Sequence, residues 1–108
     1  MPEQNRNYAK KNLSSVNLTG ADLNGADFSE ANLRHGTMHQ TNLSGANLRN
    51  ADLTRNNLSG ASLTNATLTG ANLEAADLRD ANLSGANLQR ARLAGADGRL
   101  VRRAMAVG

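Results

Sequence analysis

The sequence repeats every five residues, and this period limits the possible folds more than any other feature of the chain. Counting in fives from Leu13 to Leu93 meets a large apolar residue every time. Two positions before this centre stands Ala in 12 of 17 repeats, and one position before it stands Asn or Asp in 13 of 17. Such regularity indicates a repeat architecture. The centres are Leu13, Leu18, Leu23, Phe28, Leu33, Met38, Leu43, Leu48, Leu53, Leu58, Leu63, Leu68, Leu73, Leu78, Leu83, Leu88 and Leu93.

A period of five fits neither a continuous helix nor a continuous strand. On a helix, five residues carry the side chain about 140° past a full turn, so the centres would spread around every side. On a strand, an odd spacing would send successive centres to opposite faces. A short extended segment followed by one turn per repeat buries them all. Glycine, which adopts positive φ without strain, stands at the second position after the centre in Gly20, Gly25, Gly45, Gly60, Gly70, Gly85 and Gly95.

Turns of about 90° would close a coil after four repeats, which is 20 residues. Successive coils would then stack about 4.8 Å apart with strand-like hydrogen bonds. Residues 20 apart share a face, and we number the four faces by their first centres, Leu13, Leu18, Leu23 and Phe28. The sequence therefore predicts an all-β solenoid whose interior is lined by the centres and the alanines.

The repeat resembles the motif of the pentapeptide-repeat protein family. Three segments show the resemblance well: Ala46-Asn-Leu-Arg-Asn50, Ala51-Asp-Leu-Thr-Arg55 and Ala81-Asn-Leu-Ser-Gly85. The resemblance covers residues 11–95. It implies a right-handed quadrilateral β-helix of just over four coils. The handedness is implied by the resemblance alone, because the period does not determine it.

The composition agrees with a narrow tube. Leu, Ile, Val and Phe make up about a fifth of the chain, a share that in an ordinary sequence would warn of disorder. Cys and Trp are absent, which excludes a disulfide scaffold and a Cys-ligated zinc module. There is neither an apolar run long enough to cross a membrane nor the apolar core of a signal peptide near the N-terminus. We therefore expect no membrane contact and a bacterial-type cytoplasmic location.

The repeat divides the chain into three segments. Residues 1–10 are expected to be an N-terminal cap or tail, and residues 11–95 the solenoid. Residues 96–108 depart from the repeat and are basic, so we expect a C-terminal cap, a homodimer contact of the kind that the resemblance implies, or a frayed tail. An apolar helical stripe and a short strand fit this segment equally well. The stripe consists of Leu100, Val101, Ala104 and Met105.

One polar residue stands at an inward position. The small inward residues of the second face are Val16, Gly36, Asn56 and Ala76. Gly36 leaves space beside Asn56 in the neighbouring coil, so we expect a compensated packing defect rather than a functional amide. Because Met38 and Thr41 also depart from the consensus, we expect an irregular coil over residues 36–41.

No catalytic constellation stands out. His35 and His39, with Glu30 nearby, would suit a transition metal, but the spacing fixes no third ligand and we interpret both as surface histidines. The aspartates occupy the Asn/Asp position of the repeat, and the Ser and Thr residues follow a turn preference. We therefore predict no catalytic residues, no metal, no cofactor and no enzyme activity.

Charge separates three function classes. Residues 11–95 carry seven basic and seven acidic side chains. The resemblance implies one alternative, since the quinolone-resistance branch of the pentapeptide-repeat family mimics DNA and binds DNA gyrase. Such mimicry needs a dense negative field in place of the phosphates. The neutral solenoid therefore disfavours a DNA mimic. Weak nucleic-acid binding through the basic C-terminus is a third alternative, disfavoured because the chain offers no aromatic platform.

We therefore predict a non-catalytic structural scaffold or protein–protein interaction module whose partner is another protein. The third face carries small side chains and a single charge. Such a flat surface would suit docking of a partner protein, or it would merely display the consensus residues of the repeat. The first face and its corners carry mixed charges suited to polar recognition. The candidate contact residues are Arg34, His35, Arg55, Arg99, Arg102 and Arg103.

Overall fold

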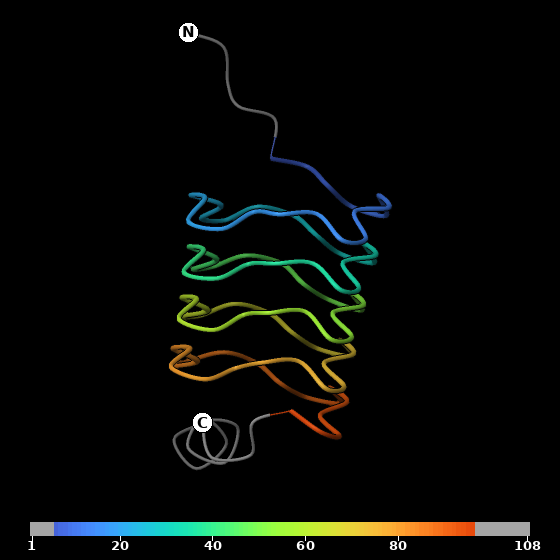
Figure 1. The fold of residues 1–108 in the computed structure, drawn as a ribbon, viewed down its shortest axis with the longest axis vertical. Coiled ribbons are helices and arrows are strands. Elements are labelled where there is room, and N and C mark those ends of the chain that lie inside the picture. Colours follow the sequence, from blue (N-terminus) through green and yellow to red (C-terminus); the bar gives the residue numbers. More distant parts are fainter. Residues whose placement is uncertain (1–5, 97–108) are drawn as a thin grey trace, which may run out of the picture.

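The chain winds into a tube of stacked coils (Figure 1) in the computed structural model, which describes residues 6–96. Within this range there is neither a helix nor an extended strand; instead, each of eighteen repeats contributes a single β-bridge residue, one position before its centre. The bridges are parallel and join residues 20 apart, from Asn7 with Asp27 to Asn72 with Arg92. Four repeats therefore form one coil, and the described range holds about four and a half coils.

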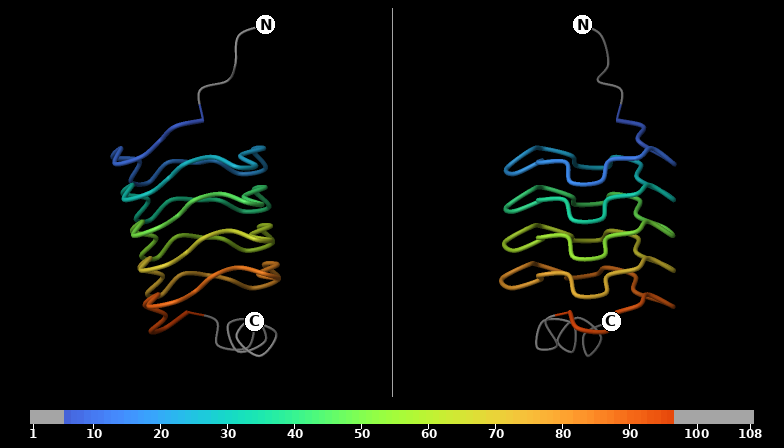
Figure 2. Two further views of the ribbon diagram at one scale, coloured as in Figure 1. Left: turned by 180° about the vertical axis from the view of Figure 1, so that it is seen from behind. Right: turned by 45° about the vertical axis from the view of Figure 1, so that its right-hand side comes forward.

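The same backbone hydrogen bonds recur in the repeats. In one repeat, the Leu33 N–H donates to the Asp52 carbonyl of the next coil at 2.8 Å, and the Asn32 N–H donates to the Lys11 carbonyl of the previous coil at 2.9 Å. The turn is closed by the Gly36 N–H, which donates to the Leu33 carbonyl at 3.2 Å. The interior coils thus pair their backbone on both sides, as a buried backbone requires, and the stacked layers are visible in both views of Figure 2.

Each turn places its second residue after the centre in the left-handed region. Seven of these residues are glycines, with φ between 68° and 78°. The other eleven have φ between 57° and 64°, and none of them is β-branched, the side-chain type that tolerates this region worst. The glycines therefore mark only part of a uniform turn. The eleven are Lys10, Ser15, Glu30, His35, Gln40, Asn50, Arg55, Asn65, Ala75, Asp80 and Arg90.

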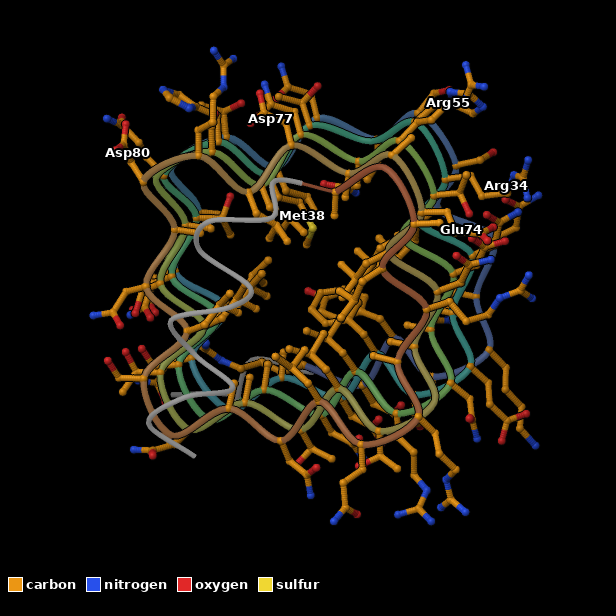
Figure 3. The ribbon with its side chains drawn as sticks, turned by 90° about the horizontal axis from the view of Figure 1, so that it is seen from below. Arg34, Met38, Arg55, Glu74, Asp77 and Asp80 are labelled. Atoms are coloured by element: carbon orange, nitrogen blue, oxygen red, sulfur yellow. The ribbon has the colours of Figure 1, made fainter. Side chains whose placement is uncertain are left out.

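The centres form one continuous core along the axis of the tube (Figure 3). Thirteen of the seventeen are buried, from Leu23 to Leu83. The other four, Leu13, Leu18, Leu88 and Leu93, are only partly buried. These four lie in the terminal coils, where the described residues supply a neighbouring coil on one side only. Their burial therefore depends on what covers the ends of the tube.

The solenoid begins earlier than the sequence motif indicates. Residues 6–10 wind as one more repeat, with Tyr8 at the centre position, and the Tyr8 ring stacks on Phe28 of the next coil with centroids 5.0 Å apart. Arg6, standing where most repeats have Ala, extends its Nη1 to the carbonyl oxygens of Asp22 and Asn24 at 3.1 and 3.2 Å. Of the segment expected as a C-terminal cap, only Ala96 lies within the described residues.

The buried Asn56 reaches into the space that Gly36 leaves. Its Nδ2 donates to the Leu33 carbonyl at 2.9 Å, whereas its Oδ1 is buried without a hydrogen-bond partner. A Cβ on Gly36 would lie 2.9 Å from this Nδ2. Thr41, also buried, donates to the Leu18 carbonyl at 2.7 Å. The coil over residues 36–41 keeps the regular bridge at Thr37 and the regular ladder, so the expectation of an irregular coil is wrong.

No helix within residues 6–96 is long and apolar enough to cross a membrane.

The left-handed turns predict opposite effects for two substitutions. Gly25→Ala should lower the free energy of unfolding by about 1 kcal/mol, because a Cβ there meets no atom within 4 Å and only the φ of 72° opposes it. Ala75→Gly should raise the free energy by a similar amount, since it relieves the same strain at a φ of 59°. Urea titration of both variants checks this. Equal and same-signed changes would contradict the interpretation.

Gly36 and Asn56 should behave as a coupled pair. Gly36→Ala alone should cost about 1–3 kcal/mol, because the new methyl group contacts the Asn56 amide. Asn56→Ala should be neutral or stabilising, since the Leu33 carbonyl keeps its bond from the Gly36 N–H and a buried orphan acceptor is removed. The double variant should therefore be more stable than the sum of the singles predicts, by about 1 kcal/mol or more.

Denaturant unfolding of the wild type, both single variants and the double variant completes this cycle. Strict additivity, or a loss above about 2 kcal/mol for Asn56→Ala, would overturn this account of the core.

Candidate interaction surface

The short polar side chains of the faces lie flat against the turns. The Asp or Asn before each centre accepts a hydrogen bond from the N–H two residues later, as Asp27 does from Ser29 at 2.9 Å and Asn47 does from Arg49 at 3.1 Å. This is the Asx-turn geometry. It holds these side chains close to the backbone, so that the longer side chains of the turn residues project beyond them (Figure 3). The projecting residues therefore decide what a partner meets.

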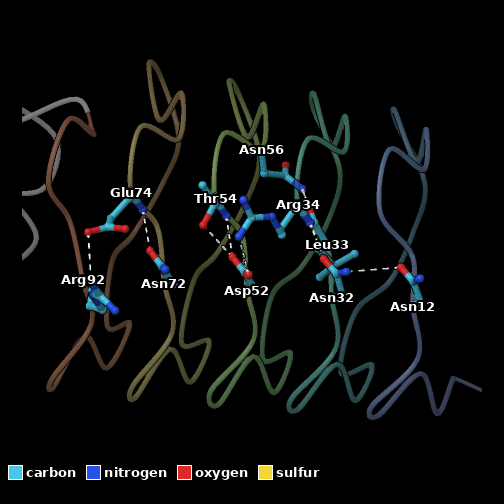
Figure 4. A network of polar contacts seen from close by, with 10 residues as sticks. All are labelled: Asn12, Asn32, Leu33, Arg34, Asp52, Thr54, Asn56, Asn72, Glu74 and Arg92. Atoms are coloured by element: carbon cyan, nitrogen blue, oxygen red, sulfur yellow. Dashed lines mark hydrogen bonds and ion pairs between the residues drawn. The ribbon is translucent and has the colours of Figure 1, made fainter.

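Charged side chains on the first face pair across adjacent coils (Figure 4). The Arg34 Nη1 lies 3.2 Å from the Asp52 Oδ2, and the Arg92 Nη2 lies 3.3 Å from the Glu74 Oε2. In both pairs, the residue that follows a centre contacts the residue that precedes the centre of the next coil, 18 positions later. The first of these residues is the cation in the Arg34–Asp52 pair and the anion in the Glu74–Arg92 pair. The two carboxylates of the first face are therefore neutralised within the face.

Three of the candidate contact residues lie together at the edge between the first and second faces. His35 and Arg55 occupy the same turn position in successive coils, and Arg34 precedes His35. All three are exposed, and Figure 3 shows Arg34 and Arg55 projecting on the same side of the tube. The other candidates, Arg99, Arg102 and Arg103, lie outside the described residues.

The structure does not gather ligands around the histidines. His35 is exposed at its edge, whereas His39 is half-buried on the second face, with its Nδ1 2.8 Å from the Ser59 Oγ. Ser59 in turn donates to the Asn57 Oδ1 at 2.6 Å. Within residues 6–96, no group of three or more His, Asp or Glu side chains could hold a metal ion. The His39–Ser59 contact was missed by the sequence analysis, although their 20-residue spacing could have revealed it.

The charges divide by side, a feature hidden by the balanced count of acids and bases. The edge between the fourth and first faces exposes one carboxylate, Glu30, against the four basic side chains of Lys10, Lys11, Arg49 and Arg90. The second and third faces carry three aspartates against the single Arg79, which is paired with Asp77 at 2.8 Å. The aspartates of this side are Asp22, Asp77 and Asp80. The surface is therefore basic along one edge and acidic on the opposite side.

Turn hydrogen bonds shift the pKa of three aspartates. The N–H of Ser29 and then its hydroxyl hold the pKa of Asp27 below its ordinary value. At Asp52, burial raises the pKa, but the hydroxyl and N–H of Thr54 together with the Arg34 guanidinium outweigh it, so that the pKa is lowered. At Asp77, the hydrogen bond from the Arg79 side chain is the largest cause of a lowered pKa. These carboxylates therefore stabilise the fold only when ionised.

Acid should weaken the fold through these groups. Because the folded pKa values lie below the unfolded value of 3.8, the stabilisation is fully present above about pH 5 and is lost as the pH falls through the folded values. Asp27→Asn with Asp52→Asn should reduce this loss, since the amide oxygens still accept the turn bonds but no longer titrate. Urea unfolding from about pH 7 to pH 3 measures it, and an unchanged acid loss in the double variant would contradict the assignment.

Comparison with known proteins agrees with this geometry. The family model described as pentapeptide repeats matches residues 12–50, 37–70 and 68–97, with 8 copies. No curated protein matches the chain.

Three solved structures that superpose on the chain come from one plant and two cyanobacteria. A pentapeptide repeat protein of the Arabidopsis thaliana thylakoid lumen superposes with a TM-score of 0.80 at 32% identity, over 82% of this chain and 62% of that chain. HetL from Nostoc sp. PCC 7120, involved in heterocyst differentiation regulation, gives 0.66 at 33% identity, over 84% and 56%. Rfr23 from Cyanothece 51142 gives 0.51 at 31% identity, over 85% and 86%.

The chain thus spans less than two thirds of the length of the first two of these structures. The five-residue period, the 20-residue bridges, the family model and these structures all point to one fold. The chain belongs to the pentapeptide-repeat family and is a β-helical solenoid.

Proposed function

We propose that this solenoid is a non-catalytic scaffold that binds another protein through the side chains projecting from its turns. The observation that carries the proposal is that these side chains project from a backbone held in a fixed register. Each turn is fixed by its left-handed residue, and each interior coil by hydrogen bonds to the coils on both sides. Because this backbone is ordered before binding, docking of a partner costs mainly the rotamer freedom of the side chains that it contacts. The winding that we infer is right-handed, which the similarity to pentapeptide-repeat β-helix structures supports.

Charge argues against the DNA-mimic alternative. A duplex presents one negative charge per about 1.7 Å of its axis, whereas the described residues carry nine basic and seven acidic side chains. The acidic side holds only Asp22, Asp77 and Asp80, and Asp77 is already paired with Arg79. Such a surface offers no continuous replacement for two rows of phosphates.

The experiment combines capture with a direct binding measurement. The chain is immobilised, exposed to protein from its source cells, and any retained protein is purified and mixed with the soluble chain. Sedimentation velocity should then show a complex of fixed stoichiometry. We expect replacement of the projecting side chains at an edge to weaken the complex, for example by Arg34→Thr, His35→Ser and Arg55→Ser. Each new residue type already occurs at the equivalent position of another coil.

A DNA gyrase supercoiling assay provides the opposing arm. Unchanged supercoiling with the chain at near-stoichiometric amounts is the expected result. Inhibition there, or the absence of any protein forming a defined complex, would overturn the proposal.

A further inference from the structure

We propose that the edge between the fourth and first faces binds an acidic α-helix of the partner protein, lying along the axis of the solenoid. The inference deepens the proposed function and rests on it. It names the edge and the chemistry of the partner, which the fold alone does not supply.

The cations on this edge recur at every second coil. Lys10 and Arg90 occupy the same turn position 80 residues apart, which is four coils. Midway stands Asn50, and directly before it Arg49, so the edge carries a cation in the first, third and fifth coils. All three cationic side chains are exposed, and none forms an ion pair within the part of the chain that the structure describes.

The spacing matches a helix better than a strand. Two coils rise by about 9.6 Å at the usual inter-strand distance. Seven residues of an α-helix rise by about 10.5 Å and return the side chain to nearly the same face. In a strand, the residues nearest to this distance are three apart and point to opposite faces. Carboxylates at i, i+7 and i+14 of a helix would therefore face Lys10, Arg49 and Arg90 in turn, and the long cationic side chains absorb the small mismatch.

Glu30 separates a helix from a phosphate backbone as the partner. It stands in the second coil on the same edge, between Lys10 and Asn50, and its exposed carboxylate forms no ion pair within residues 6–96. A nucleic-acid strand would place a phosphate against it, because phosphates recur every 3.4 Å or so along the axis. A helix can instead place a Lys there, at i+3, about 4.5 Å from the first carboxylate. The edge thus predicts the pattern Glu, Lys, Glu, Glu at i, i+3, i+7 and i+14.

The neighbouring charges orient such a helix. On the first face, Arg34 and Arg92 are already paired with Asp52 and Glu74, so they compete little for the partner's carboxylates. The second and third faces, on the opposite side, are acidic and would repel the helix. The edge between the first and second faces offers Arg55 as its one cation outside these ion pairs, so the row of three recurring cations is found on one edge.

A synthetic peptide tests the inference directly. The probe is a labelled Ala/Gln-based helix carrying Glu at i, i+7 and i+14 and Lys at i+3. The control peptide has the same composition with its charges spread around the helix. Fluorescence anisotropy with the full chain should show binding of the first peptide only. The binding should weaken as added salt screens the exposed charges.

Matched variants locate the site. The double variant Arg49→Ser with Arg90→Asn should weaken peptide binding by about tenfold, as the loss of two exposed ion pairs implies. Both new residue types already occur at the equivalent positions of other coils. Arg79→Ser with Asn82→Asp changes the net charge equally on the acidic side and should leave the affinity within about twofold. Circular dichroism and thermal melting establish that each variant is folded.

Glu30→Lys decides between the two kinds of partner. It should weaken binding of the peptide, whose Lys then faces a like charge, while favouring a DNA duplex. The inference is overturned if the control peptide binds equally well, if the two double variants behave alike, or if the wild-type chain prefers duplex DNA to the peptide. A partner complex that survives Arg49→Ser with Arg90→Asn would remove this inference and leave the proposed function standing.

Discussion

The backbone ladder between coils is the constraint from which the rest of the molecule follows. Residues 20 apart can pair in parallel only if the chain turns by the same amount after every fifth residue, and the left-handed residue of each turn provides that uniform bend. Once the register is fixed, two positions of each repeat point inward and must fill a narrow interior. Leu and Ala suffice for this, because stacking on the same residue types above and below buries most of them completely. A small apolar content is therefore a consequence of the geometry rather than a weakness.

The same ladder explains how the core accepts polar residues. Thr41 and Asn56 stand at inward positions normally held by Ala, and both donate to the carbonyl of a centre 23 residues earlier, Leu18 and Leu33 respectively. That carbonyl already accepts the N–H that closes its turn, so its second lone pair is available to a side chain from the next coil. A hydroxyl is satisfied by this single bond, whereas an amide has an acceptor left over, as the buried Asn56 Oδ1 shows.

The register and the inward positions follow from the five-residue period, and the Ala-(Asn/Asp)-Leu motif carried the resemblance to the family. The sequence alone placed the start of the solenoid too late, since Arg6 and Tyr8 replace Ala and Leu and conceal a repeat whose backbone is regular. It identified the turns by their glycines and could not show that residues such as Ala75 and Asp80 share the same φ, because that conformation is imposed by the neighbouring coils. The division of charge between sides was lost in the net charge, although sorting the residues by 20 would have revealed it.

The ion pairs of the solenoid lie on its faces rather than at its corners. All three ion pairs within residues 6–96 join the residue after a centre to a residue before one: Arg34 with Asp52, Arg92 with Glu74, and Arg79 with Asp77. None involves the second residue after a centre. That residue has a left-handed backbone at the corner of the tube, where two faces meet (Figure 3). The charges paired on the first and second faces therefore serve the fold, whereas Lys10, Glu30 and Arg90 on one edge form no ion pair within residues 6–96. Exchanging residues at the corners would alter the surface that the proposed partner meets while keeping the backbone ladder that holds the coils together.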